Sequence, residues 1–378
     1  FGLFCPLYKK PSGVWIMAYT DIDDPTAYFQ TKIYTGSDNG ALTQVVTNDG
    51  NSDLQPDWIW IKRRNGSANH SITDTVRGLT IGLSTSTNAA EVDDDFGVTA
   101  VGSDGFSVRE NTSAQGQVNT GTLVAWQWKA ETAFSNDASS TSVGTIDSAG
   151  SASTASGFSI VSWTGTGSAG TIAHGLGKLP KMIIAKQRNS TANWVVYFLD
   201  TSIANNNVNN YLELDTTAAS TGDSGGRWGA YANYSTNTFG VGTDNGTNVS
   251  GGTYIAYVFS DIQAYSKIGK YVGDGNADGT FIYTGFKPAF VISKKNSGTS
   301  NWVMFDNKRD VDNVCHHSLY ANLSNAETTS DAKDIDMLSN GFKFRTAESE
   351  VNGSGESYIY MAFAENPFVT STGVPATA

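Results

Sequence analysis

Short apolar runs alternate with polar, glycine-rich stretches along this chain, and one kind of run occurs three times after a proline. The runs WIWIK, MIIAK and FVISK begin two residues after Pro56, Pro180 and Pro288. Proline suits the start of a strand, and short runs of β-branched or aromatic residues suit a buried strand. Gly, Asn, Asp and Ser clusters recur at intervals of roughly ten residues, as the turns of all-β sandwiches do. The pattern predicts many short strands and no long helix.

The three runs belong to longer copies of one pattern. Each copy has a lysine six residues after its proline, an asparagine thirteen residues after it, then a tryptophan or histidine, and later a closing apolar segment. The matched positions are Lys62, Lys186 and Lys294, then Asn69, Asn193 and Asn301, then His70, Trp194 and Trp302; the closing segments are TLVAWQW, TYIAYVF and SYIYMAF. Fixed spacing in three places indicates an internal repeat.

These copies, called repeats 1, 2 and 3 below, predict an all-β fold of three tandem β-sandwich domains of the jelly-roll or lectin-like kind. A copy of roughly a hundred residues is long enough to bury a core of its own. The predicted segments are 1–27 (N-terminal), 28–130 (repeat 1), 131–156 (a Ser/Ala/Thr-rich linker), 157–264 (repeat 2), 265–368 (repeat 3) and 369–378 (C-terminal tail). Residues 1–16 read unlike the rest, and Met17 resembles a natural start. We therefore expect residues 1–16 to be upstream sequence or a fragment edge.

Composition narrows the class of partner. The net charge is −12, with 24 Lys and Arg against 36 Asp and Glu. Nucleic-acid binders neutralise phosphates with Lys and Arg, so we expect no nucleic-acid partner. No apolar run approaches the roughly 18 residues of a membrane helix, so we expect no membrane insertion. Cys5 and Cys315 are a single distant pair, which cannot form a disulfide framework.

Several long blocks carry a resemblance to a known family. They are MAYTDIDDPTAYFQ, GFSIVSWTGTGSAGTIAHGLGKLPKMIIAKQRN and ADGTFIYTGFKPAFVISKK, with NWVMFDNKRD and YIYMAFAENPF further on. Together, over residues 17–368, they resemble a repeated domain of unknown function from tail and tail-fibre-like proteins of marine bacteriophages, including cyanophages. The resemblance implies a virion-associated structural or host-recognition role. It also implies contacts with other tail proteins and a homo-oligomer, a trimer by analogy with fibres. It implies no catalytic residues.

Aromatic side chains are the candidates for glycan binding, because their flat faces stack on sugar rings. Trp228, Tyr231 and Tyr234 lie in the polar stretch GGRWGAYANYST, where a recognition loop is expected. Trp194 and Trp302 are weaker candidates. They begin apolar runs at a fixed repeat position, so core packing is the favoured reading for both.

A calcium-like pattern occurs at the start of repeat 3. Asp274, Asn276 and Asp278 place oxygen ligands at alternate positions, as in the first half of a calcium loop. Gly285 stands where such a loop needs its last carboxylate, so the full motif is broken. A cation completed by other loops is one reading, and a tight Asx turn is favoured. No other cofactor is expected.

Two features would indicate an enzyme: a serine-protease-like segment and a pair of carboxylates. GDSGG at residues 222–226 resembles the nucleophile segment of chymotrypsin-like proteases, but no histidine stands in the setting that this family needs. A surface turn is favoured there. A carboxylate pair for glycoside hydrolysis cannot be recognised from spacing.

We therefore expect a non-enzymatic protein of the phage tail or fibre, located in the virion and extracellular when acting, that recognises a host-surface glycan. Two alternatives stay open. One is a glycan-degrading enzyme of the tailspike or secreted kind, and the other is a bacterial cell-surface adhesin.

Overall fold

The fold is built almost entirely from antiparallel strands, which confirms the all-β prediction. The computed structural model describes residues 7–9, 15–17, 19–37, 43–93, 97–109, 117–199, 209–223, 225–230, 233–329 and 331–375. The helical elements within these residues are single turns: η1 (Pro25–Ala27), α1 (Ala138–Thr141) and η3 (Asp331–Lys333). Near the N-terminus, β1 (Leu7–Lys9) pairs with β2 (Trp15–Met17).

Each repeat contributes a large and a small sheet. Repeat 1 has a six-stranded sheet and a three-stranded sheet. The strands of the large sheet are, in order, β3 (Phe29–Thr35), β11 (Thr122–Trp128), β5 (Trp58–Arg63), β6 (Ser71–Asp74), β7 (Gly78–Leu83) and β8 (Val92–Asp93). The small sheet has β4 (Gln44–Thr47), β10 (Gly105–Arg109) and β9 (Gly97–Gly102).

Repeat 2 and the segment before it form an eight-stranded sheet and a two-stranded sheet. The order in the large sheet is β12 (Thr132–Asn136), β13 (Ser148–Ser153), β14 (Phe158–Thr164), β21 (Thr253–Phe259), β16 (Met182–Gln187), β17 (Val195–Phe198), β18 (Asn209–Glu213) and β19 (Thr221–Asp223). The small sheet pairs β15 (Gly170–Ala173) with β20 (Thr238–Val241).

Repeat 3 forms a five-stranded and a three-stranded sheet. The large sheet has β22 (Ser266–Val272), β29 (Ser357–Pro367), β24 (Phe286–Lys295), β25 (Trp302–Asp306) and β26 (Leu319–Tyr320), and the small sheet has β23 (Phe281–Tyr283), β28 (Gly341–Phe344) and β27 (Ile335–Leu338). Four strands therefore come in the same order in each large sheet. They are the first strand of the repeat (the opening strand), its last strand (the closing strand), the strand that carries the repeated lysine, and the next strand along the chain.

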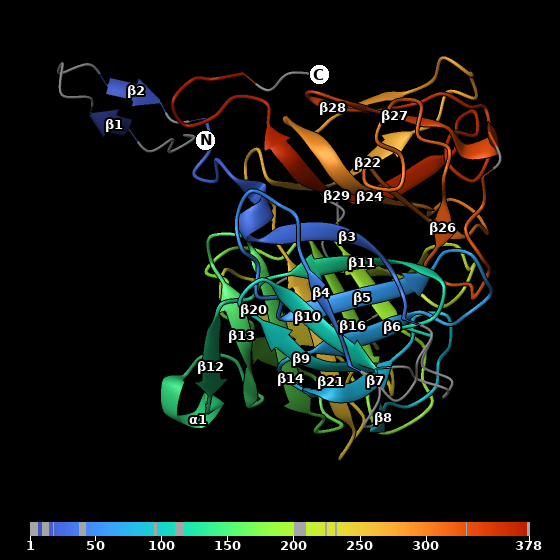
Figure 1. The fold of residues 1–378 in the computed structure, drawn as a ribbon. Helices are drawn as coiled ribbons and strands as arrows, with labels where there is room; N and C mark the ends of the chain where they lie inside the picture. Colours follow the sequence, from blue (N-terminus) through green and yellow to red (C-terminus); the bar gives the residue numbers. More distant parts are fainter. Residues whose placement is uncertain are drawn as a thin grey trace.

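The two faces of each large sheet bury different cores. Side chains alternate along a strand. In β29, Tyr358, Tyr360 and Ala362 pack toward the small sheet of repeat 3, while Ile359 and Met361 enter a core that all three large sheets share. The strands β11 and β21 alternate in the same way. Figure 1 shows β22, β24 and β29 above β3, β11 and β5, with β14, β21 and β16 completing the group. The three predicted domains are therefore parts of one packed body, and the division into three domains stays a prediction.

Residues 131–156, predicted as a linker that lends a strand through SVGTI, contribute two strands to the large sheet of repeat 2, and SVGTI (residues 142–146) lies in neither of them. Within them β12 pairs with β13, and β13 pairs with β14. Small side chains make this pairing close: a Cβ at Gly150 would lie 1.9 Å from the Ile160 carbonyl oxygen. The α1 turn between the two strands is capped by Asp137, whose carboxylate accepts the N–H groups of Ser139 and Ser140. A Ser/Ala-rich composition therefore reflected tight packing here.

Cys315 is a buried free thiol, and Cys5 lies outside the described residues. In the part of the chain that the structure describes, no helix is long and apolar enough to cross a membrane.

Candidate functional site

The three large sheets meet at three junctions, and the residue after the repeated asparagine closes each of them. Its side chain donates a hydrogen bond to a backbone carbonyl of the neighbouring repeat. The pairs are Trp194 Nε1 to Ser84 O (2.8 Å, first–second junction), Trp302 Nε1 to Glu213 O (2.9 Å, second–third junction) and His70 Nε2 to Tyr320 O (2.8 Å, third–first junction). The repeats therefore close into a ring, in which each repeat contacts both of the others.

Backbone hydrogen bonds cross the junctions at matched positions. Each junction has two of them, with N···O distances of 2.8 to 3.0 Å. At the first–second junction the bonds are Ala192 N to Asn88 O and Glu91 N to Arg188 O. At the second–third junction they are Ser300 N to Thr217 O and Ser220 N to Asn296 O. At the third–first junction they are Ala68 N to Ser324 O and Glu327 N to Arg64 O. This common backbone pattern shows that the three junctions have the same geometry.

His70 performs the role of the two tryptophans with a different side chain. Its Nδ1 accepts a hydrogen bond from Trp60 Nε1 at 2.7 Å, so Nε2 must carry the proton that is donated to Tyr320. The imidazole is fully buried, and burial together with the charge of Lys62 lowers its pKa to about 3. The ring is therefore a neutral structural donor at ordinary pH.

The repeated lysines are also buried at the junctions. Lys62, Lys186 and Lys294 have no exposed surface, and burial is the main cause that lowers the pKa of each to about 8. Each ammonium donates to the carbonyl of the following residue, at 2.6 to 2.8 Å. Lys62 and Lys294 also reach a carbonyl of the neighbouring repeat, at Ser324 and Thr217. The lysine recurs at the same position of each repeat, and each copy has the same structural role: it donates a hydrogen bond to a carbonyl at a junction.

Charged side chains reinforce two of the three junctions. At the third–first junction, buried Asp306 pairs with Arg309 at 2.6 Å and accepts from Trp126 Nε1 at 3.0 Å. Glu327 binds both Arg309 and Arg64. The first–second junction repeats this arrangement with Asp74, Arg77, Tyr257, Glu91 and Arg188.

The second–third junction has uncharged residues at the same positions. Phe198 stands at the position of Asp306 and Asp74. Met361 stands at the position of the hydrogen-bond donors Trp126 and Tyr257. Phe198 and Met361 both belong to the core that the three sheets share. Ser220 and Asn296 replace the glutamate and the arginine. The Asp-x-x-Arg spacing in TDTVRG and FDNKRD, absent from repeat 2, was the sequence signal for these networks, and sequence reasoning missed it.

Four of the five predicted glycan-binding aromatics lie inside the protein. Trp194, Trp302, Trp228 and Tyr234 are at most 7% exposed. Trp228 and Tyr234 pack against Tyr197. Tyr231 lies outside the described residues. A buried ring has no face for a sugar, so the structure gives these four side chains a packing role.

The calcium-like segment is a hydrogen-bonded turn. The Asp274 carboxylate accepts from Asn276 N, and Asn276 Oδ1 accepts from Asp278 N. The Asp278 carboxylate binds Lys343 at 2.8 Å and Arg345 at 2.6 Å. Within the described ranges, no group of three His, Cys, Asp or Glu side chains is placed to hold a metal ion.

The GDSGG segment is organised by its aspartate. The Asp223 carboxylate accepts the backbone N–H groups of Gly226, Arg227 and Trp228 at 2.5 to 3.0 Å, while Ser224 lies outside the described residues. Asp223 therefore fixes a turn and is not placed as a free acid or base.

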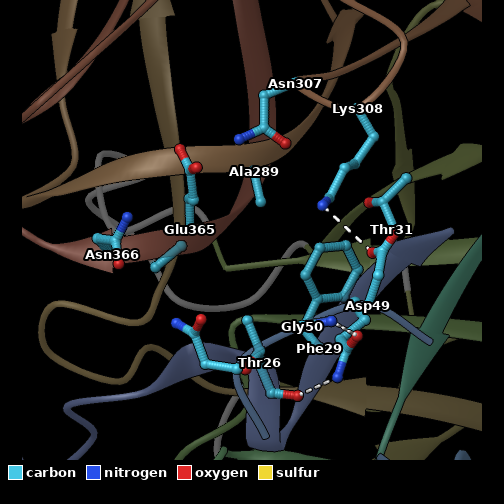
Figure 2. A pocket seen from close by; sticks show the side chains of 13 residues that line it. Thr26, Phe29, Thr31, Asp49, Gly50, Ala289, Asn307, Lys308, Glu365 and Asn366 are labelled. Atoms are coloured by element: carbon cyan, nitrogen blue, oxygen red, sulfur yellow. Dashed lines mark hydrogen bonds and ion pairs between the residues drawn. The ribbon is translucent and has the colours of Figure 1, made fainter. Parts of the chain in front are cut away.

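A small polar pocket opens at the third–first junction. Its cavity measures about 140 Å³ between β3 and the turn after β25. Figure 2 shows Phe29 on one side, facing Asn307 and Lys308 on the other. Lys308 is paired with Asp49 at 3.3 Å. The lining thus combines amide, ammonium and carboxylate groups around the aromatic ring of Phe29.

The acids of the polar pocket do not fit glycoside hydrolysis. Partial burial raises the pKa of Asp49, but its hydrogen bond to Lys32 and the charges of Lys308 and Lys32 outweigh burial and hold that pKa below its usual range. Glu365, the other lining acid, lies 3.2 Å from Lys287. The general acid of a glycosidase needs a raised pKa. The pocket therefore suits binding better than catalysis.

One comparison with known proteins gave a match. A family model described as a domain of unknown function, DUF7483, matches residues 24–367 and so spans all three repeats. The comparisons with curated proteins and with solved structures found no match.

Proposed function

The chain belongs to the DUF7483 family, a domain of unknown function, and from its geometry we propose a non-enzymatic component of a bacteriophage tail that recognises a host cell-surface glycan. The phage and tail parts of this proposal are supported by the sequence resemblance over residues 17–368. The binding part is supported by the polar pocket at the third–first junction.

The observation that carries a structural and binding role is the closed ring. Three sheets share one core, and among the described residues every junction has two backbone hydrogen bonds and the side-chain donor that follows the repeated asparagine. Such a body presents its surface grooves in a fixed geometry. A preorganised groove loses little conformational entropy when it binds a ligand.

The buried groups with shifted pKa values support the same reading, because each has a structural task. His70 and the three repeated lysines donate hydrogen bonds at the junctions. Burial raises the pKa of Asp215 to about 6, and this carboxylate accepts the backbone N–H of Trp194. Catalytic sites also shift pKa values, but they do so at an open cleft.

Binding of the fluorescently labelled chain to a panel of marine bacterial strains tests the proposal. We expect saturable labelling of some strains, which isolated surface glycan from the same strain competes away. Release of reducing ends from that glycan, measured in parallel, would contradict the non-enzymatic part. Sedimentation at several concentrations tests the expected homotrimer, and a monomer at high concentration would contradict it.

A further inference from the structure

One buried hydroxyl group in the polar pocket is not satisfied by the described part of the protein. Thr31 lines the pocket from β3 and is 3% exposed. Its Oγ1 atom makes no hydrogen bond with any residue that the structure describes. A buried hydroxyl group without a partner destabilises a fold, so native proteins contain few of them. The Thr31 hydroxyl is therefore a group that a ligand in the pocket can satisfy.

The other two repeats show that the fold accepts an apolar side chain at the position of Thr31. Each opening strand pairs with its closing strand in the same register, and the matching pairs are Thr31 with Trp126, Ile160 with Tyr257 and Ile268 with Met361. Ile160 belongs to the shared core, and Ile268 packs against it. Packing of the ring therefore does not require a hydroxyl group at this position.

Three asparagine amides surround the same pocket. Asn51 follows β4, Asn307 follows β25, and Asn366 lies near the end of β29. Their amide groups make no hydrogen bonds with the residues that the structure describes. Figure 2 shows Asn307 and Asn366 on the repeat 3 side of the pocket, with Phe29 on the repeat 1 side. Because an amide both donates and accepts, these groups suit the hydroxyl groups of a ligand in either role.

The acids that line the pocket already have cationic partners in the protein. Asp49 lies 3.1 Å from Lys32 and 3.3 Å from Lys308. Glu365 lies 3.2 Å from Lys287. An ionic ligand would compete with one of these pairs, whereas a neutral ligand can form hydrogen bonds without separating them. The pocket therefore favours an uncharged ligand that carries several hydroxyl groups.

The apolar part of the lining is small and lies between the polar groups. It consists of Phe29, Ala289 and Ala364. The cavity of about 140 Å³ is smaller than the roughly 300–1,000 Å³ of pockets for drug-sized ligands. A sugar ring has a face of C–H groups and a rim of hydroxyl groups, so a single ring matches this arrangement.

We propose that the polar pocket binds one uncharged terminal sugar residue, an inference that rests on the proposed glycan recognition and names the ligand of its pocket. The sugar hydroxyl groups exchange hydrogen bonds with Thr31 and with the three asparagine amides. The C–H face of the sugar lies against Ala289 and Phe29. Because repeats 2 and 3 have isoleucine in place of Thr31, the site occurs once in the ring.

Calorimetric titration of the full chain with methyl glycosides tests this proposal. The neutral probes are the methyl glycosides of glucose, galactose and mannose, and the charged probes are methyl glucuronide and methyl galacturonide. We expect at least one neutral probe to bind with a stoichiometry of one, and its charged counterpart to bind more weakly. Binding of no neutral probe would overturn the proposal, and so would tighter binding of the charged one.

Two variants locate the site without removing a contact of the fold. Thr31→Val removes the unpartnered hydroxyl, so the melting temperature should be retained while the dissociation constant of the sugar rises about tenfold. A purely structural hydroxyl would give the reverse, a lower melting temperature with unchanged affinity.

The second variant, Ala289→Lys, fills the pocket with the side chain that repeat 2 has at the matched position, Lys181, which also stands one residue after its proline. We expect sugar binding to be lost and the fold to be retained. Lys181→Ala, the reverse change at the second–third junction, is the matched control and should leave sugar binding unchanged. Equal affinity of Ala289→Lys and the wild type would overturn the site.

Labelling of the bacterial strains separates this inference from the proposed function. Loss of both labelling and sugar binding in Ala289→Lys supports both. If Ala289→Lys loses the methyl glycoside but labels the strains as the wild type does, glycan recognition stands and the polar pocket is not its site. A wild-type chain that binds a neutral glycoside in the pocket but labels no strain would retain the sugar site and contradict the proposed function.

Discussion

The third–first and second–third junctions have the same backbone pattern but opposite chemistry. One buries Asp306, Arg309 and Glu327 with Trp126, while the other has Phe198 and Met361 at the matched positions. The comparison shows that, among the residues that the structure describes, the second–third junction forms without the Asp–Arg–Glu network of the other two. Since a buried ion pair often contributes little net stability compared with apolar residues, we infer that the networks help each repeat to recognise its correct neighbour.

The largest effect is expected from breaking the network at the third–first junction. Arg309→Ala leaves Asp306 buried without its partner, which should lower the free energy of unfolding by about 3–5 kcal/mol. Denaturant titration measures this change.

A multiple variant that gives the third–first junction the residues of the second–third junction is the matched comparison for Arg309→Ala. Thr201 stands three residues after Phe198 in the sequence, as Arg309 does after Asp306. Asp306→Phe with Arg309→Thr, Glu327→Ser, Arg64→Asn and Trp126→Met should recover most of the stability that Arg309→Ala alone loses. If the copied junction is as unstable as the single variant, the equivalence of the two junctions is wrong.

Acid should weaken the third–first junction through His70. The folded pKa is about 3 and the unfolded one is near 6.5. The unfolded chain therefore binds more protons in between, and stability falls as the pH drops through this window, by about 2–3 kcal/mol near pH 4. His70→Gln keeps one acceptor for Trp60 and one donor for Tyr320. Its unfolding free energy should fall less with acid than that of the wild type, and an identical pH profile would show that His70 is not buried in its neutral form.

A rise of the pH above 8 should increase the stability of the protein through its buried lysines. The folded pKa of Lys294 is about 8 and its ordinary value is 10.5. The unfolded chain binds the additional proton between these values, so stability should rise from about pH 8 to pH 10, by about 2 kcal/mol for this lysine. Lys294→Met should remove that part of the rise. Above pH 10, buried tyrosines such as Tyr257, whose pKa burial raises, oppose the trend.

The smallest effect is expected from a substitution in β22, at the second–third junction. A Cβ at Gly269 would lie 2.9 Å from the Tyr360 hydroxyl, so Gly269→Ala should cost about 1 kcal/mol and shift the Tyr360 ring. Denaturant titration measures this change, and a Gly269→Ala variant as stable as the wild type would contradict the close contact with Tyr360.

Local pattern was enough to predict the strands, because apolar alternation and the three prolines mark them directly. The ring was not predictable in this way. A closing strand such as TYIAYVF is apolar on both faces, and nothing in it says that Tyr254 faces its own small sheet while Tyr257 faces a core shared with two other repeats. His70 looked like a departure from the pattern, yet it makes the same hydrogen bond as the tryptophans.

The binding residues were harder to predict than the fold. Aromatics in GGRWGAYANYST were chosen for their polar setting, but Trp228 and Tyr234 fill the core of repeat 2. A cavity at the second–third junction is lined by Lys181 from one repeat and Lys267 from the next, which only the ring brings together. Sites made by long-range packing leave no local spacing in the sequence.

Scanning calorimetry of the full chain tests the central claim, that three sheets around one shared core form a single cooperative body. We expect one transition in which the calorimetric enthalpy equals the van't Hoff enthalpy. Two or three separable transitions, each with its own enthalpy, would show independent domains and contradict the shared core.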